Sequence, residues 1–171
     1  INLNNVFDTS LTLEGAYELA TINSVGPVAN SFGLIIDTLE ELTIIGNQDL
    51  SLDDLEIDPL VLVDASAFTG DLDASFVNDD DAGLDGINDA ITVIGGLGAD
   101  SLSFDGPLNS DVTVSGGAGD DSITFYEIGG RSSFDMDDSV DGGDGDDELR
   151  IEVVGGPGND QQLLLTGVGP N

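Results

Sequence analysis

The sequence lacks several residue types on which protein chemistry commonly depends. Cys, His, Trp and Lys are absent from the 171 residues, and Arg131 and Arg150 are the two basic residues. Without Cys, neither a disulfide nor a thiolate metal site can form. Without His, Cys or Lys, catalytic triads, thiol nucleophiles and Schiff bases are excluded, so we expect the chain not to be an enzyme.

The scarcity of positive charge leaves the acidic residues unbalanced. There are 35 Asp and Glu residues, and the formal net charge is -33. Such a surface repels nucleic acid and anionic membranes, so we expect neither nucleic-acid binding nor membrane insertion. Acidic composition is also typical of disordered chains. Regular runs of Val, Ile and Leu favour a folded chain instead, and its carboxylates must then be neutralised by cations.

The chain carries no visible signal peptide at Ile1 and no apolar run of transmembrane length. Its single methionine is Met136. We therefore expect a processed product or a piece of a longer protein, and the length fits one domain.

Short aliphatic runs recur along the chain in pairs separated by turns. The first run of each pair leads into a turn that starts at Gly46, Asp64, Gly95, Gly116 or Gly142. We call the edge formed by these turns edge A, and the opposite, more variable edge is edge B. The second runs follow at residues 50–52, 72–76, 101–104 and 122–126. This organisation predicts an all-β fold, a right-handed parallel β-solenoid in which Leu102 and Ile123 are buried and stacked.

The solenoid is expected to span residues 1–171 as a single segment with three parts. Residues 1–40 form the least legible coils, with weak helical periodicity at residues 11–22. Residues 41–90 form coils without calcium, and residues 78–88 are read as a loop on edge B. Residues 91–171 form the calcium-binding coils.

The pattern Gly-Gly-x-Gly-x-Asp-x-U-x, where U is a large aliphatic residue, carries the chemistry. It fits at every position in residues 95–103, 116–124 and 142–150. Residues 155–160 keep the turn but lack the aliphatic residue, and residues 85–91 are a degenerate copy. The candidate metal-binding residues are Gly95, Gly96, Gly98, Asp100, Gly116, Gly117, Gly119, Asp121, Gly142, Gly143, Gly145, Asp147, Gly156, Gly158 and Asp160.

The spacing of this motif has a physical reason. Glycines allow φ > 0 and turn their carbonyls toward one point, and the Asp adds a carboxylate there. Coils stack about 4.8 Å apart and calcium–oxygen bonds are roughly 2.3–2.6 Å long, so an ion between two turns can contact both. Hard oxygen ligands suit Ca²⁺. We expect Asp121 to contribute one oxygen to each of two sites, and Arg150 to pair with neighbouring carboxylates.

These motifs resemble those of the RTX family, the secreted calcium-binding β-roll proteins of Gram-negative bacteria. The resemblance implies export of an unfolded chain and folding on calcium outside the cell. RTX rolls usually place closer-spaced motifs on both edges. Here the spacing puts the calcium ladder mainly on edge A, with Asp160 as an exception.

Residues 42–76 are similar to the calcium-dependent surface-layer proteins of alphaproteobacteria. This second resemblance implies an extracellular structural segment that self-associates into a lattice or filament. Cell-surface polysaccharide is a further expected partner. Two alternatives are open. The chain could be an RTX module of a large adhesin, or the β-roll of a secreted hydrolase whose catalytic domain lies elsewhere.

Overall fold

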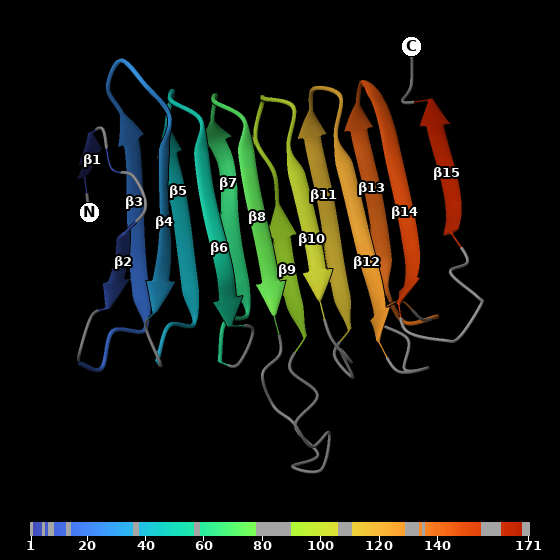
Figure 1. Cartoon of the computed structure of the whole chain (residues 1–171), viewed down its shortest axis with the longest axis horizontal. Coiled ribbons are helices and arrows are strands. Elements are labelled where there is room, and N and C mark those ends of the chain that lie inside the picture. The colour runs from blue at the N-terminus through green and yellow to red at the C-terminus, as the bar shows by residue number, and fades with distance from the viewer. Residues whose placement is uncertain are drawn as a thin grey trace.

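The computed structural model describes residues 2–4, 6, 9–12, 15–35, 38–56, 59–77, 90–105, 111–128, 134, 136–154 and 162–168. Its strands form two sheets wound from one chain, with the two ends of the chain at opposite ends of the solenoid (Figure 1). Within these ranges, no helix is long and apolar enough to cross a membrane. The two sheets, in which strands of successive coils are neighbours, confirm the predicted β-solenoid fold class.

The odd-numbered strands, up to β13, form sheet A and the others form sheet B. Sheet A consists, in spatial order, of β1 (Asn2–Asn4), β3 (Leu19–Val25), β5 (Glu41–Gly46), β7 (Leu62–Phe68), β9 (Ile91–Ile94), β11 (Val112–Ala118) and β13 (Ser139–Asp144). Sheet B consists of β2 (Thr9–Thr12), β4 (Asn30–Ile35), β6 (Leu50–Glu56), β8 (Leu72–Val77), β10 (Ser101–Asp105), β12 (Ser122–Ile128), β14 (Asp146–Val154) and β15 (Gln162–Val168).

Neighbouring strands pair in parallel, as the repeats predict. Strand β9 pairs with β11, and β10 pairs with β12 in the register Leu102–Ile123. Among the described strands, the antiparallel pair is β14 with β15. Parallel pairing between strands one coil apart follows from the solenoid winding, while its right-handed sense stays a prediction.

Alternating side chains of both sheets form the core between them. Leu102 and Ile123 are buried, as expected. Phe76, Phe104 and Phe125 stack along the axis, with ring centroids 4.9 and 4.8 Å apart. Three successive coils of sheet B place a Phe at the same height, so this aromatic column adds ring stacking to the aliphatic packing of the core.

One local expectation is wrong: the turn expected at Asp64 is misplaced, because Asp64 lies inside β7. The register with β5 shifts there, from Thr43–Asp64 to Ile45–Ala67, so a bulge absorbs the extra residue. The turn follows Phe68 instead. The weak helical periodicity at residues 11–22 corresponds to no helix in the described part of this range, where β2 ends at Thr12 and β3 begins at Leu19.

The turns of edge A are short links from sheet A to sheet B along one edge of the solenoid (top edge in Figure 1). In the second and third motifs, strand pairing continues through the paired glycines, with Gly117 opposite Gly143. The proposed edge-B loop at residues 78–88 and the fourth motif, with Gly156, Gly158 and Asp160, lie outside the described residues.

Candidate metal site on edge A

One column of residues runs along edge A, where each strand of sheet B begins. The strand registers place one residue of each coil at this height. Every member is buried, and the exposed fraction is at most 8%. We call this set the inner column: Asn30, Leu50, Leu72, Asp100, Asp121 and Asp147.

The buried side chains of the inner column are of three chemical types: an amide, two aliphatic side chains and three carboxylates. Asn30 is satisfied by hydrogen bonds: its Oδ1 accepts from the N–H of Val6 (2.8 Å), and its Nδ2 donates to Ser24 Oγ (2.8 Å). Leu50 and Leu72 are apolar and fully buried. The three motif coils place carboxylates at the same height, where burial is unfavourable for a charge unless a partner compensates it.

The three carboxylates form a hydrogen-bonded ladder that runs toward the N-terminal coils. Oδ1 of Asp100 accepts from the N–H of Leu72 (2.9 Å). Oδ1 of Asp121 accepts from the N–H of Asp100 (2.8 Å), and Oδ1 of Asp147 accepts from the N–H of Asp121 (3.0 Å). Each motif Asp is thereby tied to the preceding coil through one oxygen.

The second carboxylate oxygens of Asp100 and Asp121 differ in their surroundings. Oδ2 of Asp100 accepts a hydrogen bond from the N–H of Gly96 (2.7 Å). Oδ2 of Asp121 is buried and has no hydrogen-bond partner within the described part of the chain. A buried carboxylate oxygen of this kind lacks the compensation that burial normally requires.

The first glycine of each motif has no side chain and so leaves room for Oδ2 of the Asp in the same motif. A Cβ on Gly116 would overlap both Oδ2 of Asp121 and the carbonyl oxygen of Gly142. A Cβ on Gly95 would likewise overlap the carbonyl oxygen of Gly116, and would lie 2.7 Å from Oδ2 of Asp100. A carboxylate oxygen of one coil and a carbonyl oxygen of the next therefore face the same glycine.

Positive φ angles occur in the second and third motifs. Gly117 and Gly119 have φ of 112° and 126°, and Gly143 and Gly145 have 100° and 149°. This confirms the expected use of left-handed backbone at these four glycines. In the first motif, close packing alone explains Gly98, because a Cβ there would overlap the carbonyl oxygen of Gly70.

Burial and mutual repulsion act on the central carboxylates. Burial, together with the charges of Asp100, Asp147 and Asp120, raises the pKa of Asp121 to about 6 against the opposing effect of the hydrogen bond from the N–H of Asp100. Burial also raises the pKa of Asp100, against the hydrogen bonds from Gly96 and Leu72. The site thus concentrates negative charge where water is excluded, which favours a bound cation.

A second set of hydrogen bonds, from exposed Asp side chains beside the inner column and interrupted at Ala99, was missed from the sequence. Oδ1 of Asp49 accepts from the N–H of Asp71 (3.1 Å), and Oδ1 of Asp71 accepts from the N–H of Ala99 (2.9 Å). Oδ1 of Asp120 accepts from the N–H of Asp146 (3.0 Å). The available signal was an Asp directly before the inner-column residue, which also occurs in coils without the glycine motif.

The residues present fit a calcium ion when carboxylate and carbonyl oxygens act together. Within the described ranges, no three Asp or Glu side chains lie close enough to hold a metal ion between them. A site here would therefore combine motif carboxylates with glycine carbonyls, which are oxygen ligands of the kind that Ca²⁺ takes.

The structure stacks the three complete motifs in register, so residues 95–100, 116–121 and 142–147 lie coil upon coil. It places Arg150 between Glu148 and Glu152, with ion pairs to both, as expected. No protein-family model matches the chain, and no curated protein and no solved structure matches it either.

Proposed function

We propose that the edge-A turns bind calcium and that the chain is an RTX-type structural segment of an extracellular, surface-layer-like assembly. The observation that carries the calcium proposal is Oδ2 of Asp121, which is buried without a hydrogen-bond partner in the described part of the chain. The carbonyl oxygen of Gly142 faces the same glycine as this atom. A cation is the partner that both oxygens can share.

The described ligand residues would come from three stacked turns. The carboxylates of Asp100, Asp121 and Asp147 supply charge, and glycine carbonyls supply neutral oxygens. The glycines concerned are Gly95, Gly96, Gly98, Gly116, Gly117, Gly119, Gly142, Gly143 and Gly145. When bound, the ion supplies positive charge that offsets carboxylate repulsion, and its binding free energy adds to the folding free energy.

The structural role is supported by the shape and composition of the chain. A stack of coils with a repeating core is a stiff module, and its net charge of -33 favours calcium-mediated contacts over direct ones. The alternatives are an RTX module of a secreted adhesin or the β-roll of a secreted hydrolase. Cell-surface polysaccharide is the proposed further partner, and no catalytic role is proposed for these residues.

Calorimetric titration of the metal-free protein with calcium tests the site. We expect heat of binding together with a gain of β-sheet circular dichroism, and Mg²⁺ should substitute poorly because it prefers octahedral, partly hydrated sites. Glu41→Gln removes one exposed charge from sheet A and serves as the matched control, with binding unchanged. Absence of binding heat in the unaltered protein would contradict the proposal.

Electron microscopy of the calcium-loaded protein tests the assembly. A two-dimensional lattice supports the surface-layer-like role. Isolated rods at the same protein concentration support the adhesin module instead.

A further inference from the structure

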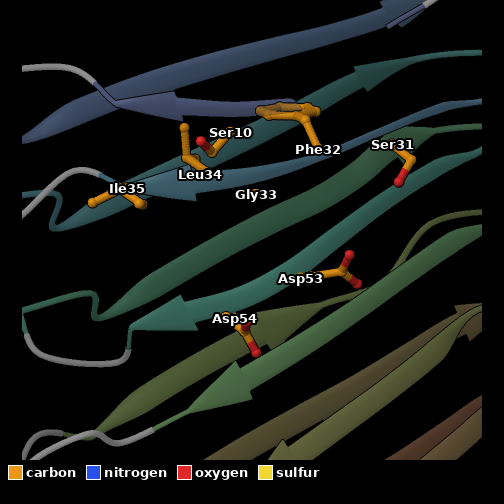
Figure 2. A pocket seen from close by; sticks show the side chains of 8 residues that line it. All are labelled: Ser10, Ser31, Phe32, Gly33, Leu34, Ile35, Asp53 and Asp54. Atoms are coloured by element: carbon orange, nitrogen blue, oxygen red, sulfur yellow. The ribbon is translucent and has the colours of Figure 1, made fainter. Parts of the chain in front are cut away.

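A groove of about 390 Å³ lies on the outer face of sheet B, in the N-terminal coils. It is lined by residues of strands β2, β4 and β6 (Figure 2). The lining residues are Ser10, Ser31, Phe32, Gly33, Leu34, Ile35, Asp53 and Asp54. Since these residues take no part in the calcium site, the groove needs its own explanation.

The groove exists because a glycine occupies an outward position of β4. Gly33 lies in register between Ser10 of β2 and Asp53 of β6. The nearest heavy atom to a Cβ on Gly33 would be the Ser10 Cβ, 3.9 Å away, so a side chain would fit there without a clash. The absence of a side chain at Gly33 therefore leaves a gap in the outer face, and no neighbouring atom requires a glycine at this position.

A β-bulge places two carboxylates at the wall of this gap. The register between β6 and β8 shifts between Leu52 and Leu55, which are both buried. Asp53 and Asp54 between them are both exposed, although neighbours in a regular strand face opposite sides. Asp54 has φ of 56°, and its N–H donates to Ser75 Oγ (2.8 Å).

Arg150 places a guanidinium group on the same outer face of sheet B, next to acidic side chains. Ser75, Ser103, Thr124 and Arg150 follow one another in register along sheet B. Both salt bridges of the described residues belong to Arg150, which pairs with Glu148 and, at 3.6 Å, with Glu152. Asp53 and Asp54 therefore receive no salt bridge from the described part of their own chain.

The uncompensated charge affects the neighbouring carboxylates. Burial raises the pKa of Asp73, and the charge of Asp53 raises it further. Burial also raises the pKa of Asp105, and the charge of Asp54 adds to this effect. A cation in the groove would relieve both repulsions.

We propose that the groove binds an arginine or lysine side chain of a partner protein. The head group pairs with the carboxylates of Asp53 and Asp54, and the hydroxyl groups of Ser10 and Ser31 line the same groove. Ile35, 48% exposed, offers an apolar wall to the aliphatic stem of such a side chain. A neutral saccharide would leave the carboxylates without counter-charge, and no three acidic side chains of the described residues could hold a metal ion.

Binding of a fluorescein-labelled peptide of alternating arginine and glycine to the calcium-loaded protein tests this proposal. Anisotropy is measured at physiological ionic strength, so that long-range attraction to the acidic chain is screened. Gly33→Leu fills the groove and leaves every charge in place. Asp53→Asn with Asp54→Asn removes the two carboxylates, and Asn tolerates the left-handed backbone at position 54. Glu40→Gln with Glu41→Gln removes two adjacent exposed carboxylates elsewhere and is the control.

We expect Gly33→Leu and the Asp pair to weaken peptide binding at least about tenfold each, with the control changing it less than about twofold. Equal weakening by both carboxylate pairs, with Gly33→Leu inert, would overturn the proposal in favour of non-specific attraction. Binding of a neutral oligosaccharide in place of the peptide would also overturn it. Gly33→Ser, a smaller filling, replaces Gly33→Leu if the thermal melt shows that Leu unfolds the protein.

Discussion

The backbone N–H of Asp100 donates a hydrogen bond of 2.8 Å to Oδ1 of Asp121, one coil further along edge A. The same relation joins Asp121 to Asp147. Asp121 is therefore the central member of the ladder, in contact with the coil before it and the coil after it. A substitution of Asp121 therefore affects the contacts with two neighbouring motif coils. A substitution of Asp100 or Asp147 affects the contact with one other motif coil.

A substitution at the centre of the ladder and one at its end should reduce the number of bound calcium ions by different amounts. Asp121→Ala is expected to damage both sites between the described motifs, because it removes the shared carboxylate. Asp100→Ala is expected to damage mainly one. Counting bound ions by calorimetry or native mass spectrometry checks this, and equal losses in the two variants would contradict a shared ligand.

Stability without calcium should increase as the pH falls. Asp121 has a folded-state pKa of about 6 against an ordinary value of 3.8, so the folded protein retains a proton between these values that the unfolded chain has lost. Its contribution is therefore unfavourable above pH 6 and is relieved as the pH falls toward 4. After allowance for solvent screening, the effect is about 1–2 kcal/mol.

Urea unfolding in metal-free buffer at pH 7 and pH 5 measures this dependence. Asp121→Asn should flatten it, because the titrating group is removed. With saturating calcium the order should reverse, since protons compete with the ion for carboxylates. A calcium-free protein that is more stable at pH 7 than at pH 5 would show that Asp121 is not repelled in the folded state.

Much of edge A could be predicted from the sequence, because the glycine motif repeats with unambiguous residue types. Asp100, Asp121 and Asp147 stand where the repeat places them, one above another. The continuation of their column through Leu72, Leu50 and Asn30 could not be predicted. The two leucines share burial but no chemistry with Asp, and Asn30, whose Oδ1 also accepts a backbone N–H, lies outside any glycine motif. A pattern search follows residue type, whereas the solenoid only requires that each coil fills the same space.

Leu72→Ala tests whether the apolar part of the inner column works without calcium. Leu72 is fully buried, so we expect a loss of about 2–4 kcal/mol of unfolding free energy from the transfer and cavity costs. The number of bound calcium ions should stay the same, in contrast to Asp100→Ala. Chemical unfolding with a parallel ion count measures both quantities, and a loss of ions in Leu72→Ala would place this residue within the metal site.

Gly116→Ala tests the space that the motif glycine provides. A Cβ there would overlap Oδ2 of Asp121 and the carbonyl oxygen of Gly142, so we expect a cost of about 1–3 kcal/mol and weaker calcium binding. Gly33→Ala is the matched control, because its Cβ would meet no atom closer than 3.9 Å. Similar melting temperatures for the two variants would argue against a crowded oxygen pair at Gly116.

The bulges explain why the outer faces were less predictable than the core. Periodicity of two identifies buried positions such as Leu52 and Leu55, but one extra residue between them changes the face of its neighbours. The same effect placed Asp64 inside β7 rather than in a turn. Neither bulge carries a glycine or proline signal, so only the register between strands reveals them.

Hydrogen exchange with and without calcium tests the central claim most directly. Without the ion, the stacked carboxylates of residues 100, 121 and 147 repel one another with no Lys to offset them, so the motif coils should open first. We expect removal of calcium to deprotect the amides of residues 91–149 first and most. The coils of residues 42–76 should lose less protection, because Leu50 and Leu72 fill their part of the inner column. Unchanged protection of residues 91–149 after calcium removal would contradict the account.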